Sequence, residues 1–221
     1  MALYAIGDIH GCLRALQTIF EHAPIKEQDQ VVFLGDYVDR GPDVKGVFDW
    51  LLANQNTYRF EYLLGNHEIM MRTARGDDEQ FNWWQMFGGR ETLESYDLAD
   101  DPNWAEKVDP EHWRFMDDCK PYLEVGEYIF VHGGLEPGVA LADQNMHHLY
   151  WKKYEAPVMY HPEKTVICGH TSRKNGEIAH FGHTTCIDTF AHGGQWLTCL
   201  NVETGEYWQA NQQADIKIGA L

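Results

Sequence analysis

Positive charge is scarce in this sequence. Its 221 residues include 17 Lys and Arg against 34 Asp and Glu, which gives a formal net charge of −17. Nucleic-acid backbones and anionic membrane surfaces would repel such a chain, so we expect neither as a partner. A small phosphate site is still compatible with this charge, because bound cations would reverse the field locally.

Long apolar runs are absent and cysteines are few. No stretch approaches the roughly 20 apolar residues of a membrane-spanning helix, so we expect a soluble, cytoplasmic protein. No repeat or low-complexity linker divides the chain, so we expect one domain over residues 1–221. The five cysteines are scattered and form no CxxC pair, which predicts reduced thiols and no disulfide framework. They are Cys12, Cys119, Cys168, Cys186 and Cys199.

Two carboxylates and a guanidinium follow one predicted strand. Gln30–Leu34 is an apolar, β-branched run typical of a buried strand, and GDYVDRG follows it at 35–41. The glycines permit a sharp bend, so the strand end brings Asp36, Asp39 and Arg40 into one small volume. Acids there can bind metal ions and the arginine can bind phosphate, although a polar surface loop would explain this segment alone equally well.

The same pattern occurs four more times along the chain. Each time, an apolar strand-like run ends at a glycine or histidine motif that contains Asp, Asn or His. Buried histidines and solvated acids would not all fall at strand ends by chance, so we interpret these motifs as one site. The runs are Ala2–Ile6 before GDIHG (7–11), Glu61–Leu64 before GNHE (65–68), Glu127–Val131 before HGG (132–134) and Thr165–Cys168 before GHT (169–171).

Helical and strand patterns alternate in the first part of the chain. Residues 12–20 and 44–54 carry apolar stripes at helical spacing, the second after Pro42 at the helix start, so a layered α/β fold is predicted. The last third is β-rich, with strands expected over 186–189, 196–202 and 207–210 and a hairpin turn at 203–206.

An aromatic segment interrupts this pattern between about residues 72 and 120. We interpret it as a helical insertion that packs beside the strand ends as a partial lid, with a break at Gly88-Gly89. Most of its aromatic residues are expected to form the core of the helices. Whether Trp83, Trp84 and Met86 line a substrate groove is left open by the sequence.

Six polar side chains at the strand ends offer carboxylate, imidazole and amide ligands without a thiolate. This set suits Mn²⁺, Fe or Zn²⁺ better than Ca²⁺ or an iron–sulfur cluster. Because the ligands are too many for one ion with open positions, we expect two divalent ions, preferably Mn²⁺, with Asp36 as the bridging carboxylate. Such a pair can polarise a phosphoryl oxygen and activate water. The candidate ligands are Asp8, His10, Asp36, Asn66, His132 and His170.

The leaving oxygen of a phosphate substrate needs a proton, and a positioned histidine is the usual donor. His67 is the candidate, with Asp39 orienting its ring and Arg40 holding the phosphate oxygens. His183 in GHT (182–184) is the one rival to His170, and it is one of six further histidines that are expected to lie mostly at the surface. These are His147, His148, His161, His180, His183 and His192.

The five motifs, in this order between residues 7 and 171, resemble those of the phosphoprotein phosphatase family of metallophosphoesterases. The similarity is to its short bacterial and bacteriophage Ser/Thr phosphatases. Bacterial diadenosine tetraphosphatases share the same superfamily signature. One such motif would be weak evidence, but five in order are highly specific.

The resemblance implies a four-layer α/β fold, a β-sandwich flanked by helices, with metals at the strand ends. It implies that His67 is the general acid, Asp39 its carboxylate partner and Arg40 a phosphate ligand. It also implies one metal bound by Asp8, His10 and Asp36, and a second bound by Asp36, Asn66, His132 and His170.

Two positions depart from the family pattern. Members that act on phosphoproteins often have Arg directly before GNHE, where this chain has Leu64. Many relatives have a further phosphate-binding Arg in a later loop, where this chain offers Lys153. A lysine is a point charge without the planar fork of arginine, so phosphate would be oriented less tightly.

The sequence therefore predicts a metal-dependent phosphomonoesterase. Phosphoserine or phosphothreonine in proteins is the first expected substrate, with phosphotyrosine or a small phosphorylated molecule also compatible. The alternative enzyme is a hydrolase of dinucleoside polyphosphates, in which the bond cleaved is an anhydride. A non-catalytic phosphopeptide-binding protein is disfavoured, because His67, Asp39 and all six ligand candidates are present.

Overall fold

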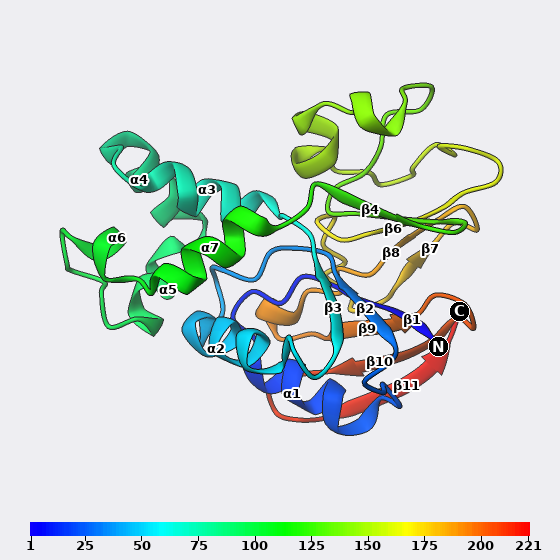
Figure 1. Ribbon diagram of the computed structural model, residues 1–221, viewed down its shortest axis with the longest axis horizontal. Coiled ribbons are helices and arrows are strands. Elements are labelled where there is room, and N and C mark those ends of the chain that lie inside the picture. Colours follow the sequence, from blue (N-terminus) through cyan, green and yellow to red (C-terminus); the bar gives the residue numbers. More distant parts are fainter.

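The computed structural model describes residues 1–221 and contains two β-sheets that stack face to face (Figure 1). The first has the strand order β11-β10-β9-β1-β2-β3 and the second has β4-β5-β6-β8-β7. The first sheet contains β1 (Leu3–Ile6), β2 (Gln30–Phe33), β3 (Arg59–Tyr62), β9 (Leu197–Asn201), β10 (Glu206–Ala210) and β11 (Ile216–Ala220). The second contains β4 (Tyr122–Val125), β5 (Tyr128–Val131), β6 (Thr165–Cys168), β7 (Ala179–His180) and β8 (Thr184–Cys186).

Each sheet contains three neighbouring parallel strands, which lie at one end of the first sheet and in the centre of the second. Strands β1, β2 and β3 pair in parallel in the first sheet, and β5, β6 and β8 do so in the second. The other strands are antiparallel to their neighbours. The carboxyl ends of parallel strands lie at one edge of a sheet, which is where ligands bind in open α/β sheets.

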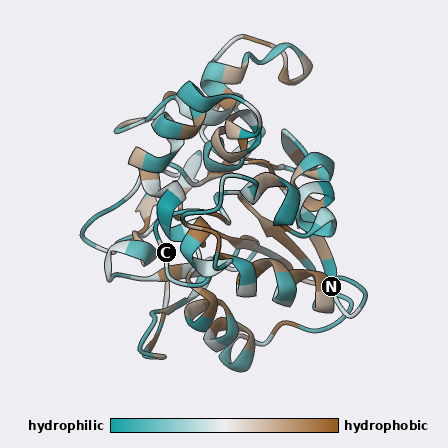
Figure 2. Ribbon diagram, turned by 90° about the vertical axis from the view of Figure 1, so that its left-hand side faces the viewer, coloured by the Kyte–Doolittle hydropathy of each residue, from teal (hydrophilic) through white to brown (hydrophobic).

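The buried apolar side chains form three clusters, and successive side chains of β1 point alternately into two of them. Leu3 and Ala5 point into the cluster between the sheets, with Phe130 and Ile167 of the second sheet. Tyr4 belongs instead to a larger cluster under the helices. Figure 2 shows the result, with apolar strands inside and hydrophilic residues on the outer helical surfaces.

The helices fall into two groups. Helices α1 and α2 pack against the outer face of the first sheet, and α3 to α7 lie to one side of both sheets (Figure 1). The outer face of the second sheet is covered by short helical turns and loops. The helices are α1 (Leu13–His22), α2 (Val44–Asn54), α3 (Asn66–Ala74), α4 (Asp78–Trp84), η1 (Gln85–Gly89), α5 (Arg90–Ser95), α6 (Trp104–Lys107), α7 (Pro110–Asp118), η2 (Leu141–Asp143), η3 (His147–Trp151) and η4 (Ala191–Gly193).

The predicted α/β fold with two sheets flanked by helices is confirmed, with local corrections. The strand expected at 61–64 is β3 at 59–62, and the strand expected at 186–189 ends at Cys186. The cap of α2 is Asp43, whose carboxylate accepts from the amide of Gly46, so Pro42 precedes the helix. Gly88 has a non-helical backbone with φ of 111°, so the break expected at Gly88-Gly89 is present between α4 and α5. No helix combines the length and apolar character needed to cross a membrane.

Candidate metal centre

Asp36 lies at the centre of a cluster of buried polar side chains. Its Oδ2 lies 3.4 Å from Nε2 of His10, and its Oδ1 lies 3.4 Å from Nε2 of His132. Two groups have ligand atoms close enough to hold a metal ion, and they share this carboxylate. One consists of His10, Asp36 and His67, and the other of Asp36, His132 and His170.

Backbone carbonyls fix which ring nitrogen of each ligand-type histidine faces the cluster. A carbonyl oxygen accepts one N–H, so the opposite nitrogen presents its lone pair to the cluster, as is usual for metal-ligating histidines. The pairs are His10 Nδ1 with Val38 at 2.7 Å, His132 Nδ1 with Leu34 at 2.8 Å and His170 Nε2 with Trp151 at 3.0 Å.

The donor set fits divalent cations. Burial lowers the pKa of His132 to about 4 and that of His170 to about 3, so both rings are neutral near pH 7. The lone pair of His132 Nε2 therefore faces a carboxylate oxygen of Asp36, and a proton or a metal cation between two such acceptors would hold them together. Burial also raises the pKa of Asp36 to about 7, and a bound cation would favour its ionised form instead.

Asn66 completes the second group, whereas Asp8 belongs to neither. Asn66 Oδ1 lies 3.0 Å from Nε2 of His132 and 2.9 Å from Nδ1 of His170. The carboxylate of Asp8 is buried close by but accepts from the backbone N–H of His170 at 3.1 and 3.2 Å.

The pair of His67 and Asp39 is held by the helical insertion. His67 Nδ1 lies 2.6 Å from Asp39 Oδ2. The indole N–H of Trp84 donates to both carboxylate oxygens of Asp39, at 2.9 and 3.0 Å, and the hydroxyl of Thr92 donates at 2.7 Å. Burial lowers the pKa of His67 and raises that of Asp39. Trp84 is therefore a buried support of this pair and not part of a groove wall.

Arg40 lies inside the cluster with a histidine that the sequence did not single out. Its Nη1 donates to Nε2 of His10 at 2.9 Å and lies 3.4 Å from Nε2 of His192. The ring of His192 is half-buried, and its centroid lies 4.9 Å from that of His10. Among the six histidines expected to lie mostly at the surface, His192 therefore contacts the cluster. Its neighbours carry no strand-end motif that could have indicated this position.

Two buried acids support the site without having been predicted. The carboxylate of Glu68 accepts from four backbone N–H groups, which ties two of the motif loops together. Asp188 accepts from the hydroxyl of Ser172, and its charge raises the pKa of Asp8 after burial itself. Asp188 follows β8 as the other acids follow their strands, so the strand-end pattern could have found it. The four donors to Glu68 belong to Asp36, Tyr37, Val38 and Gly65.

The rival histidine and the predicted lysine lie outside the cluster. His183 sits between β7 and β8, where its Nδ1 contacts the hydroxyl of Thr184, so His170 and not His183 reaches Asn66. Lys153 is exposed, and its charge is close enough to contribute to the lowered pKa of His170, after burial and His132.

The backbone of the cluster is strained. Eight non-glycine residues of the chain have positive φ, and five of them are predicted site residues. Left-handed conformations of this kind persist only where the surroundings hold them, and they gather at functional sites. The five are His10, Asp36, Asp39, Arg40 and His170.

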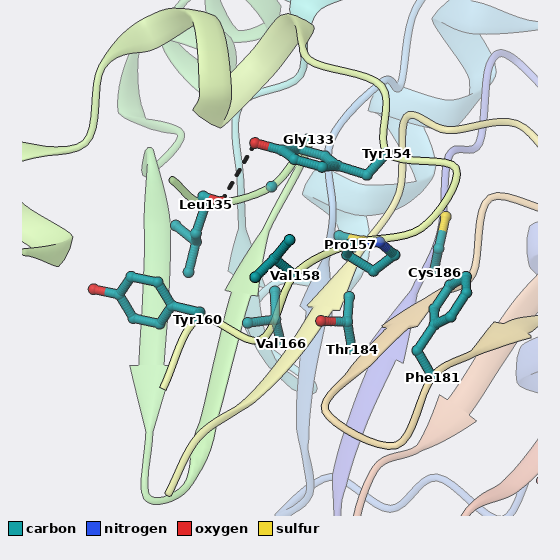
Figure 3. Close-up of a pocket in the computed structure, with 12 residues that line it drawn as sticks. Gly133, Leu135, Tyr154, Pro157, Val158, Tyr160, Val166, Phe181, Thr184 and Cys186 are labelled. Carbon is teal, nitrogen blue, oxygen red and sulfur yellow. Dashed lines mark hydrogen bonds between the residues drawn. The ribbon is translucent and has the colours of Figure 1, made fainter. Parts of the chain in front are cut away.

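A separate apolar hollow lies on the outer face of the second sheet, between β6, β8 and the segment 154–160 (Figure 3). Figure 3 shows Tyr154 beside Gly133, with its hydroxyl donating to the carbonyl of Leu135 at 3.3 Å. The backbone N–H of Tyr154 donates to Thr171 at 3.1 Å. These contacts fix the segment that carries Trp151 and Lys153, and no charged side chain lines the hollow.

A family model described as Metallophos, calcineurin-like phosphoesterase, matches residues 1–199. The chain belongs to the calcineurin-like phosphoesterases. Membership of this family implies divalent metal ions, in agreement with the two ligand groups around Asp36.

Similar proteins differ in the substrates that their names state. This phosphoesterase is 34% identical over 139 residues to a symmetrical bis(5'-nucleosyl)-tetraphosphatase of Dechloromonas aromatica, a match that covers 62% of this chain and 45% of that protein. It is 31% identical over 145 residues to the serine/threonine-protein phosphatase 4 catalytic subunit of Eremothecium gossypii, covering 62% and 40%. The chain spans less than half the length of these curated relatives.

One solved structure extends the likeness of fold over nearly the whole chain. A cold-active protein tyrosine phosphatase superposes with a TM-score of 0.70 at 16% identity, covering 98% of this chain and 78% of that one.

Proposed function

We propose that this phosphoesterase hydrolyses dinucleoside polyphosphates at a two-metal centre, with Mn²⁺ as the preferred ion. The observation that carries the metal chemistry is the pair of ligand groups joined by the buried carboxylate of Asp36. The similarity to a symmetrical bis(5'-nucleosyl)-tetraphosphatase supports the substrate class.

Each proposed site residue has its own role in this reaction. Bound divalent ions would supply Lewis acidity and activate a water for attack on phosphorus. Asp8, His10 and Asp36 would hold one ion, and Asp36, Asn66, His132 and His170 would hold the other. His67 carries a proton on Nε2 for the leaving oxygen, while Asp39 orients the ring through Nδ1. Arg40 lies beside His10 in the cluster, and its guanidinium would bind the phosphate oxygens of the substrate.

Leu64 supports a polyphosphate substrate over a phosphoprotein. Its side chain is buried in the apolar cluster that contains Ile129 and Val131, so this position offers no cation to a phosphate monoester. Phosphoprotein hydrolysis remains the second candidate, supported by the similarity to the phosphatase 4 catalytic subunit.

A comparison of two substrates tests the proposal. The Mn²⁺-loaded protein is assayed on diadenosine tetraphosphate and on a phosphoserine peptide, and the nucleotide products are separated. We expect kcat/KM at least about tenfold higher on the nucleotide, a difference of about 1.4 kcal/mol in transition-state binding, with ADP as the main product. A higher kcat/KM on the peptide would favour the protein phosphatase instead.

A further inference from the structure

A cluster of large apolar side chains, the aromatic rim, lies beside the metal centre and consists of Trp83, Met86, Phe87 and Trp151, of which Trp151 is half-buried and the other three are exposed. The Trp83 ring centroid lies 4.8 Å from that of Phe87 and 6.2 Å from that of Trp151. Trp83 is 39% exposed, Phe87 40% and Met86 81%. Large side chains that share one exposed patch commonly mark a binding surface.

The helical turn explains why neighbouring aromatic residues face opposite ways. Trp84 points inward to Asp39 and stacks near Trp104, whereas Trp83 and Phe87, four residues apart, share the outer face. The backbone kink at Gly88, within η1, then brings this residue against Arg40. A Cβ on Gly88, which has φ of 111°, would lie 2.6 Å from Cγ of Arg40.

The two ends of the rim are tied to opposite sides of the cluster. Next to Phe87, the carbonyl of Gly88 accepts from the backbone N–H of Arg40 at 3.1 Å. The carbonyl of Trp151 accepts from Nε2 of His170 at 3.0 Å. The rim therefore begins where the proposed phosphate ligand lies and ends where a proposed metal ligand lies.

Positive charge adjoins the rim in an otherwise acidic protein. Lys152 and Lys153 follow Trp151 directly and are both exposed. Flat aromatic faces next to cations and a metal centre suit a ligand in which a planar ring is joined to a chain of phosphates. A peptide would offer no planar ring at a fixed distance from its phosphate unless that residue were aromatic.

We propose that the aromatic rim binds the nucleobase of a nucleoside polyphosphate whose phosphates occupy the metal centre. The inference deepens the proposed function and rests on it. Bases of every kind have a π-face that stacks on Trp and Phe, so the rim confers affinity for nucleotides with little choice among bases.

The test compares two anhydride substrates, one with bases and one without. Diadenosine tetraphosphate carries two adenines, and inorganic tripolyphosphate carries none. In Trp83→Ala, kcat/KM for the nucleotide should fall about ten- to hundredfold further than kcat/KM for tripolyphosphate, mainly through KM. Trp83→Phe keeps a stacking ring and should recover most of this loss.

Phe181 provides the matched control. It is 38% exposed, as Trp83 is, but lies near β7 and away from the metal centre. Phe181→Ala should lower neither kcat/KM value. Equal losses on both substrates in Trp83→Ala would overturn the proposal, because the residue would then act only through the structure of the site. A selective loss on a phosphopeptide would overturn it in favour of a peptide occupant.

A binding measurement separates failure of this proposal from failure of the proposed function. If the wild type does not hydrolyse diadenosine tetraphosphate, adenosine 5'-(α,β-methylene)diphosphate and methylenediphosphonate are titrated against the Mn²⁺-loaded protein by calorimetry. Tighter binding of the adenosine compound that is lost in Trp83→Ala supports the rim as a base site. Equal binding of the two compounds by the wild type overturns it.

Discussion

The hydrogen bond from Trp84 to Asp39 offers a sharp test of how the helical insertion supports the proposed general acid. Trp84 is fully buried, and its indole N–H is one of two side-chain donors from the insertion that reach the Asp39 carboxylate. Trp84→Phe keeps an aromatic ring but removes this donor. Trp104→Phe is the control, because its ring packs 5.1 Å from that of Trp84 and makes no contact with Asp39.

The expected loss of stability follows from the hydrogen bond between Trp84 and Asp39 that the substitution removes. A hydrogen bond to a charged group contributes about 1.5–3 kcal/mol, and both variants lose a similar amount of buried ring. The free energy of unfolding should therefore fall by about 1.5–3 kcal/mol more in Trp84→Phe than in Trp104→Phe. Loss of a residue that orients another in this way typically lowers activity about 10–100-fold, which corresponds to about 1.4–2.7 kcal/mol in the activation free energy. This range is similar to the free energy expected for the lost hydrogen bond.

The assay combines urea unfolding of the Mn²⁺-loaded proteins with kcat on two phosphate esters. Phenyl phosphate has a poor leaving group that needs a proton, whereas p-nitrophenyl phosphate has a good one that needs little help. Trp84→Phe should slow phenyl phosphate hydrolysis about 10–100-fold and the nitrophenyl ester less. If the two Trp variants lose the same activity on both esters, Trp84 is merely part of the core and the reasoning fails.

The remaining predictions concern the proton donor, the metals and acid stability. The His67→Asn variant should keep the metal content of the wild type, as measured by elemental analysis. Its turnover of a substrate with a poor leaving group should be slower by about two to four orders of magnitude. A loss of metal in this variant would mean that His67 is a metal ligand instead. Chelation should abolish activity and lower Tm, because buried Asp36 loses its cation, and added Mn²⁺ should restore both. Burial lowers the pKa of His112, which lies 2.7 Å from the hydroxyl of Tyr96 and 3.2 Å from Asp49. His112 therefore binds a proton less readily in the folded state than in the unfolded state. The difference in free energy of unfolding between wild type and His112→Phe should shrink as pH falls below about 6.5. The same difference in urea unfolding at pH 7.5 and at pH 5.5 would contradict this.

The strand ends were predictable from the sequence because two simple patterns coincide there. A buried parallel strand reads as a short apolar run, and the site residue follows it after a glycine, as with Val32 and Asp36. The stacking of two sheets then gathers ends that lie far apart in sequence. Asp188 also follows a buried strand, but no glycine precedes it, and the strand pattern extends through that residue, so only half of the rule applies to it.

The supporting residues could not be predicted in the same way. Trp84 and Thr92 reach Asp39 from an insertion whose position depends on packing between helices, which no local motif records. Helical spacing does separate the inward pair Phe81 and Trp84 from the outward pair Trp83 and Phe87. That spacing was present in the sequence, but the run of consecutive aromatic residues concealed it.

The left-handed backbone of the motif loops links the stability of the fold to the chemistry of the site. Asp36 and His10 each adopt positive φ, which is unfavourable by about 1–2 kcal/mol per residue for most side chains. Glu68 offsets part of this cost, because its buried carboxylate accepts four backbone N–H groups from the loops that follow β2 and β3. A carboxylate that binds only backbone groups cannot take part in the reaction, yet without it Asp36 would relax from the position in which it faces both histidine groups. The glutamate of the GNHE motif is therefore required for the geometry of the Asp36 loop. The asparagine and the histidine of the same motif are required for the proposed metal binding and proton transfer.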